Sequence, residues 1–184
     1  HVSINVRYTF SEDVTLTSTS GTIATAAAIG GHLDLRSTSG DLTAMGFLNT
    51  VTARSTSGKI TLGGKTVYGD CTATTADLET TSGEITLLYT TCGTLTAETG
   101  SGGIDLTDTT VTGHIQAETT SGSIRFARAD AETLDLKTTS GSVSGSLLAP
   151  KIFYTDTPSG SVDVPKSTEG GLCEIRTTSG SIRI

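Results

Sequence analysis

The sequence predicts an all-β protein, a right-handed parallel β-helix of about nine turns with about 20 residues in each turn. Three observations support this prediction. A Ser-Gly pair recurs at nearly regular intervals, apolar and polar residues alternate on both sides of each pair, and no segment shows the 3.6-residue apolar period of a helix. The repeated glycines are Gly21, Gly40, Gly58, Gly83, Gly102, Gly122, Gly141, Gly160 and Gly180.

The spacing of these glycines predicts the architecture. Successive intervals are 19, 18, 25, 19, 20, 19, 19 and 20 residues, so one interval carries an insertion. One such repeat cannot bury its own apolar face, but stacked repeats bury a continuous core. Parallel crossover connections favour the right-handed form. We therefore expect one solenoid domain, 1–184, with residues 1–13 as an N-terminal strand or cap and 63–77 as a loop insertion.

The N-terminal segment lacks the Ser-Gly pair. Val2, Ile4, Val6, Tyr8 and Phe10 alternate with polar residues, which is typical of a half-buried strand. The first turn of a solenoid has an open strand edge, so we interpret this segment as its cover.

Within each copy, the residue two after the glycine is always apolar. Alternate side chains of a strand face opposite sides, so this position is expected to point into the core. The residues are Ile23, Leu42, Ile60, Ile85, Ile104, Ile124, Val143, Val162 and Ile182.

The Ser-Gly pair itself is expected to form the corner between two strands. Glycine can adopt positive φ without a Cβ clash, and nearby hydroxyls can satisfy main-chain groups. Because side chains alternate along a strand, we expect both the hydroxyl residue three before the glycine and the serine directly before the glycine to point inward. We expect these hydroxyls to form ladders along the corner.

The position four before each glycine is polar and expected to face solvent. Equivalent positions stack on successive turns, so these side chains form one outward column. We take part of this column as a candidate interaction face: Arg36, Arg54, Glu79, Glu98, Glu118 and Lys137.

The insertion between Gly58 and Gly83 is a second candidate. Insertions in repeat proteins often carry binding residues, which makes Lys65, Tyr68 and Asp70 a candidate interaction loop. The alternative is a surface loop without a ligand, since loop insertions cost little free energy.

Three cysteines do not make a disulfide framework. Cys71 and Cys92 fall at the far bend of neighbouring turns, which leaves a disulfide between them open in an oxidising compartment. Cys173 occupies an inward position and is expected to be buried.

Composition excludes several classes of function. The net charge is -7 and the basic residues are scattered, which argues against binding nucleic acid. No apolar run is long enough for a membrane span, although an anchor upstream of His1 could tether the chain. No metal or catalytic motif occurs, so we expect no cofactor, no metal site and no catalytic residues.

The copies read Thr-Thr-Ser-Gly-x-Ile/Val, as in the stretch from Thr177 to Ile182. From about residue 14 to the end, the chain resembles a bacterial family of unknown function labelled as adhesins. It departs from the motif at Gly100-Ser101-Gly102, at Pro158-Ser159-Gly160 and at the insertion. The resemblance implies a right-handed β-helix on, or tethered to, the cell surface, and no catalytic residues to carry over.

We therefore expect a non-enzymatic, extracellular or cell-surface module that acts as an adhesin or as an envelope interaction or sensing domain. Its partner would be a protein or a glycan. One alternative is a carbohydrate-active enzyme, because stacked Glu98 and Glu118 would bring two carboxyl groups together. Another is a structural stalk that assembles end to end through an open strand edge at Ile184.

Overall fold

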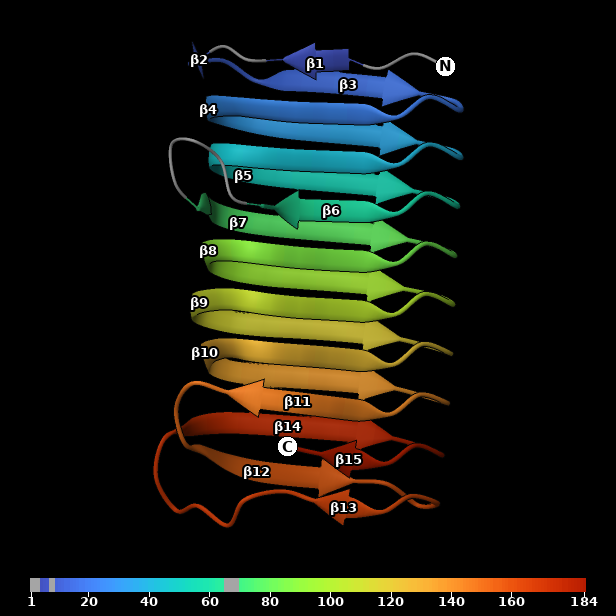
Figure 1. Cartoon of the computed structure of the whole chain (residues 1–184), viewed down its shortest axis with the longest axis vertical. Helices are drawn as coiled ribbons and strands as arrows, with labels where there is room; N and C mark the ends of the chain where they lie inside the picture. Colours follow the sequence, from blue (N-terminus) through green and yellow to red (C-terminus); the bar gives the residue numbers. More distant parts are fainter. Residues whose placement is uncertain (1–3, 7–8, 65–69) are drawn as a thin grey trace.

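The computed structural model describes residues 4–6, 9–64 and 70–184. The chain is a right-handed parallel β-solenoid of about nine turns, stacked along one axis (Figure 1). No helix occurs among the residues described. The predicted fold class is therefore confirmed.

The strands follow one another around the solenoid. They are β1 (Ile4–Val6), β2 (Thr9–Phe10), β3 (Val14–Ser18), β4 (Ile23–Ser37), β5 (Leu42–Ser55), β6 (Ile60–Gly63), β7 (Cys71–Thr80), β8 (Ile85–Thr99), β9 (Ile104–Thr119), β10 (Ile124–Thr138), β11 (Val143–Leu147), β12 (Lys151–Asp156), β13 (Val162–Asp163), β14 (Gly171–Thr177) and β15 (Ile182–Arg183).

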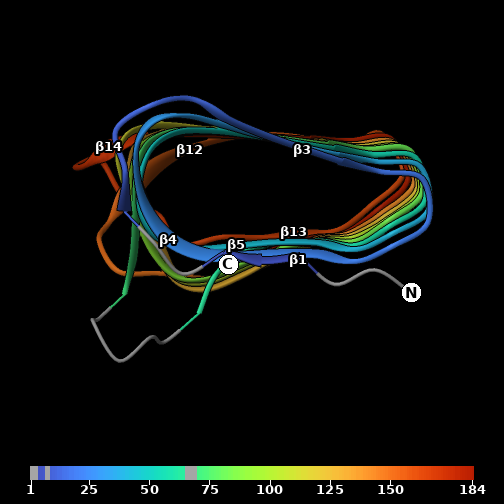
Figure 2. The same cartoon turned by 90° about the horizontal axis from the view of Figure 1, so that it is seen from above.

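Each turn is a flattened loop with two long sides, as Figure 2 shows from above. The near corner, at the Ser-Gly pairs, joins one turn to the next. Opposite it lies the far bend, through which strands such as β8 and β9 run without interruption. Register pairs Ile85 with Ile104 and Ile104 with Ile124, so the apolar columns coincide, and all three residues are fully buried.

The N-terminal segment is part of the solenoid. Its strands β1 and β2 pair with β4 in parallel, with Ile4 opposite Ile23 and Phe10 opposite Ile29. The described residues of the segment thus add a partial turn in the common register. Phe10 is partly buried and packs against the core.

The insertion is shorter than the predicted 63–77. Strand β6 extends to Gly63, and β7 starts at Cys71, which pairs with Thr90 of the next turn. Residues 71–77 therefore belong to the regular stack, because their main chain continues the ladder. Lys65 and Tyr68 lie outside the described residues.

The last two turns are stacked out of sequence order. Strand β14 lies between β10 and β12, and β15 lies between β11 and β13 (Figure 1). The expectation of an open strand edge at Ile184 is therefore wrong. Its main-chain N–H donates to the carbonyl of Asp163, and the outermost turn at this end consists of β12 and β13.

The near-corner glycines are required for a reason other than the one expected. None of these nine glycines, all of which the structure describes, has a positive φ. Instead, each glycine from Gly40 onward packs on the carbonyl of the glycine next to it in the stack. A Cβ on Gly122 would lie 1.8 Å from the oxygen of Gly102. The constraint is therefore close contact between turns.

Of the two positions predicted to form hydroxyl ladders, only the one three before the glycine does so. The Thr138 hydroxyl accepts a hydrogen bond from Gly141 N at 3.1 Å and donates to Gly122 O at 2.9 Å. The serine directly before the glycine was expected to face inward, but it is exposed in all nine copies. The corner breaks the strand alternation, because the chain already turns at the residue before this serine.

Replacing Gly122 by Ala should destabilise the protein by about 3 kcal/mol, since main-chain atoms of two turns must separate to admit the Cβ. Gly30 is the matched control, because a Cβ there would meet its nearest atom at 3.6 Å. Gly30→Ala should stay within about 1 kcal/mol of the parent. Urea unfolding measures both, and equal losses would contradict the close-contact explanation.

Thr138→Val should cost about 1–3 kcal/mol, because it leaves a buried N–H and a buried carbonyl without their partner. Thr139→Val, at the neighbouring exposed position, should change stability by less than about 0.5 kcal/mol. The difference between the two urea midpoints tests the ladder. A Thr138→Val protein as stable as Thr139→Val would contradict it.

Candidate interaction face

The six charged residues predicted to form an interaction face do lie in one unbroken column. Register pairs each with the next, in the order Arg36, Arg54, Glu79, Glu98, Glu118 and Lys137. Arg176 of β14 continues the column beyond Lys137. We call these seven residues the charged column. Two arginines, three glutamates and two further cations form successive blocks along it.

Ion pairs join the blocks. Arg54 contacts Glu79 and Asp77, each at 3.0 Å, and Lys137 Nζ lies 2.6 Å from a carboxylate oxygen of Glu118. The Glu118 carboxylate raises the pKa of Lys137, chiefly through this hydrogen bond. Exposed pairs of this kind contribute little to stability, so their main effect is to order the side chains along the surface.

Glu98 lies at the centre of the charged column and is exposed. Its register neighbours are Glu79 and Glu118, whose carboxylates are already paired with cations. Within the described parts of the chain, Glu98 has no hydrogen bond or ion pair of its own. The column therefore presents one uncompensated carboxylate, because all four of its cations are held in ion pairs.

A second charged cluster lies on the opposite long side of the turns. Lys59 Nζ is 2.7 Å from Glu84, and Arg125 is 3.8 Å from Asp105. The hydrogen bond from Lys59 lowers the pKa of Glu84, whereas burial and then Glu84 raise the pKa of Asp105. Sequence reasoning missed this cluster because Glu84 and Asp105 occupy different positions in their copies and meet only diagonally.

The far bend contains a further feature that the sequence did not reveal. Tyr89, Asp108 and Arg128 have positive φ values of 49°, 48° and 54°. They occupy the position that Gly46 and Gly64 fill in earlier turns. A side chain in this conformation strains the backbone, and such strain is often associated with functional sites.

Side-chain contacts stabilise the far bend around these three positive-φ residues. Arg128 binds Asp108 through two hydrogen bonds of 2.6 Å each. The hydroxyls of Thr90 and Thr109 donate to the carbonyls of Leu88 and Thr107, two residues earlier, and so brace the bend.

Asp70, the described residue of the candidate loop, is exposed directly before β7.

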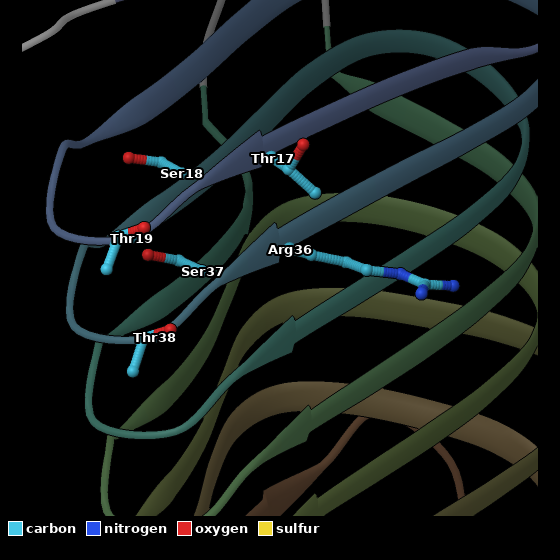
Figure 3. A pocket seen from close by; sticks show the side chains of 6 residues that line it. All are labelled: Thr17, Ser18, Thr19, Arg36, Ser37 and Thr38. Atoms are coloured by element: carbon cyan, nitrogen blue, oxygen red, sulfur yellow. The ribbon is translucent and has the colours of Figure 1, made fainter.

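A shallow hollow lies at the near corner of the first turns (Figure 3). Thr19 lies above Thr38 there, and Arg36 extends along the outside. The hydroxyls of Ser18 and Ser37 accept hydrogen bonds from Gly21 N and Gly40 N, each at 2.8 Å, so they serve the corner. The hollow is thus the space between repeated corners and has no polar group dedicated to a ligand.

All three cysteines are buried free thiols. Cys71 lies opposite Thr90, and Cys92 lies opposite Ala73, so the two cysteines are offset by two positions along neighbouring strands. The disulfide left open by the sequence is therefore not formed. Burial raises the pKa of Cys71 to about 11 and those of Cys92 and Cys173 to about 12.

The thiols should therefore be unreactive in the folded protein. At about pH 8, a pKa near 11 leaves roughly one thousandth of a thiol as the reactive thiolate. Ellman's reagent should detect no fast reaction before denaturation and all three thiols in guanidinium chloride. A single thiol in the denaturant would indicate a disulfide and contradict the structure.

No group of three or more His, Cys, Asp or Glu side chains could hold a metal ion in the ranges 4–6, 9–64 and 70–184. Over the same ranges, no helix is available to cross a membrane.

The stacked parallel turns and outward polar columns define a repetitive β-solenoid domain. A family model confirms this class and matches residues 66–184 with the description Toastrack DUF4097. The chain belongs to this family, which is a β-solenoid family of unknown function. No match was found among curated proteins or solved structures.

Proposed function

We propose that this domain is a non-enzymatic interaction module of the cell surface or another extracytoplasmic location, and that it binds a protein or a glycan through the charged column. The observation that carries the proposal is the exposed Glu98 carboxylate, which has acidic neighbours on both sides and basic blocks beyond them. A partner that presents a cation to Glu98 complements this pattern, since the cations of the column are already paired. Charge complementarity of this kind directs association and selects the partner.

The solenoid supports such a role through its rigidity. Residues on the charged column are held at the spacing of parallel strands, roughly 4.8 Å per turn. A partner therefore meets a pre-ordered row of charges, and little conformational entropy is lost on binding. The same row would serve adhesion or the sensing of envelope components, since both need selective contact without chemistry on the ligand.

The alternative is a carbohydrate-active enzyme that uses Glu98 and Glu118. Their positions on adjacent turns favour it, since paired carboxylates hydrolyse glycosidic bonds. However, Glu118 is engaged by Lys137 at 2.6 Å. One of the two carboxyl groups must act as the general acid, and with Glu118 engaged by Lys137 that role falls to Glu98 alone.

Glu98→Lys should weaken binding at least about tenfold, because it replaces the central negative charge by a positive one. The probes are a glycan array and isolated bacterial envelope fractions, applied to the labelled protein. Glu132→Lys is the matched control, since Glu132 is exposed at the far bend, away from the charged column, and the charge change is the same.

Loss of binding in Glu98→Lys with retention in Glu132→Lys supports the proposal. Absence of binding by the parent protein, or equal loss in both variants, contradicts it. Reducing-sugar release from a bound glycan that disappears in Glu98→Gln or Glu118→Gln would establish the enzyme instead.

A further inference from the structure

The stacking order of the last turns creates a slot in the solenoid. After β11 the chain continues to β12, which lies two positions beyond β10 on the same side of the stack, and then to β13. It then returns through residues 164–170, so that β14 and β15 occupy the omitted position (Figure 1). Residues 171–184 therefore fill a space whose two walls are formed by earlier parts of the chain.

The contacts that hold this inserted turn are common to all turns. Thr177 donates to the carbonyl of Gly141 at 2.9 Å, and Thr157 donates to the carbonyl of Gly180 at the same distance. Main-chain hydrogen bonds supply the rest, such as the bond from Thr178 N to Thr139 O at 3.2 Å. None of these contacts depends on whether the inserted strand comes from the same molecule.

The entrance to the slot is nevertheless selective. A Cβ at Gly171 would lie 1.8 Å from the carbonyl oxygen of Glu132, and Gly170 has a φ of +97°. The segment that enters must therefore carry two successive glycines, as Gly170 directly before β14 and Gly171 at its start do here. This requirement favours another copy of the same chain over an unrelated partner.

A buried ion pair closes the entrance. Lys151 of β12 is 5% exposed and lies 2.7 Å from Asp130 of β10. Its register partner is Gly171, which has no side chain, so the lysine crosses the level of β14 to reach the aspartate. Breaking such a pair inside a protein is costly, so exchange of the inserted turn should be slow.

The connection into the slot is suited to act as a hinge. Residues 165–170 are mostly exposed, whereas Val164 packs against the core, and the side-chain hydrogen bonds described for 164–170 join only Ser167 and Glu169 to each other. Apart from those of Val164, few side-chain contacts must therefore break for this segment to change direction, and exchange of the element that follows such a loop gives a dimer.

Exposed apolar side chains are concentrated in the part of the chain that forms the slot and the inserted turn. Of the five large hydrophobic residues exposed in the described structure, four belong to β12, β13, β14 or the segment before β12. They are Leu148 (58%), Tyr154 (62%), Val162 (46%) and Leu172 (42%). They lie on both long sides of the turns, because β12 pairs with β14 and β13 pairs with β15, so they do not form one patch.

We propose that two copies of the chain exchange their last turns: residues 171–184 of each copy fill the slot of the other. The product is a dimer joined at the ends of the two solenoids where the slots lie. This assembly goes beyond the proposed binding function and does not depend on it, because the charged column remains on the sides of the rods.

Chains that each carry one added cysteine test the exchange. Asp135 and Glu174 are register partners on β10 and β14, and neighbouring parallel strands are close enough for a disulfide. One chain carries Asp135→Cys and a second carries Glu174→Cys. After the two refold together at high concentration, exchange should produce a disulfide-linked dimer on a non-reducing gel.

The control mixture combines Asp135→Cys with Tyr154→Cys, because β12 does not pair with β10. A linked dimer in the first mixture and none in the control supports the proposal. No linked dimer in the first mixture, or equal amounts in both, overturns it. A single chain with both Asp135→Cys and Glu174→Cys should cross-link internally when monomeric, which tests the stacking order separately.

Deletion of residues 166–168 provides a second test. The shortened hinge should no longer reach the chain's own slot, so light scattering should show a dimer at concentrations where the parent is monomeric. A shortened chain that remains monomeric with an intact β-sheet circular dichroism spectrum contradicts the exchange.

Discussion

Contact between glycines at the near corner is the constraint on which the rest of the solenoid depends. Successive turns approach so closely there that a Cβ would lie 1.8–2.0 Å from the neighbouring carbonyl. This contact keeps all the turns in the same register. Because all turns share this register, apolar positions of one turn meet apolar positions of the next, and the threonine hydroxyls reach the glycine carbonyls.

Variation between copies is confined to positions that this constraint does not control. Outward residues of the long sides can change charge without changing the register, which explains how basic and acidic blocks alternate along the charged column. The far bend is also less restricted, since Tyr89, Asp108 and Arg128 replace the glycines of earlier turns. The repeated motif therefore maintains the scaffold, and the copy-specific residues are the ones available for recognition.

Similarity between copies also has a topological consequence. Every turn offers nearly the same edge to the next, so main-chain pairing alone does not determine which strand follows which. At the end of the stack where the slot lies, specific contacts select the order. Gly171 leaves room beside Glu132, and Lys151 reaches Asp130 through the space that a larger residue would occupy.

The sequence by itself determined the fold class, the inward apolar columns, the position of the corners and the stacking of the six predicted charged residues. These properties follow from a local period, which is readable because strand side chains alternate and copies are equally spaced. It did not determine that Ser179 and its equivalents face outward, that Glu84 meets Asp105, or that β14 enters between β10 and β12. Only the tertiary structure decided these points, because they depend on corner geometry and on contacts between residues distant in the chain, which a repeating pattern leaves equivalent.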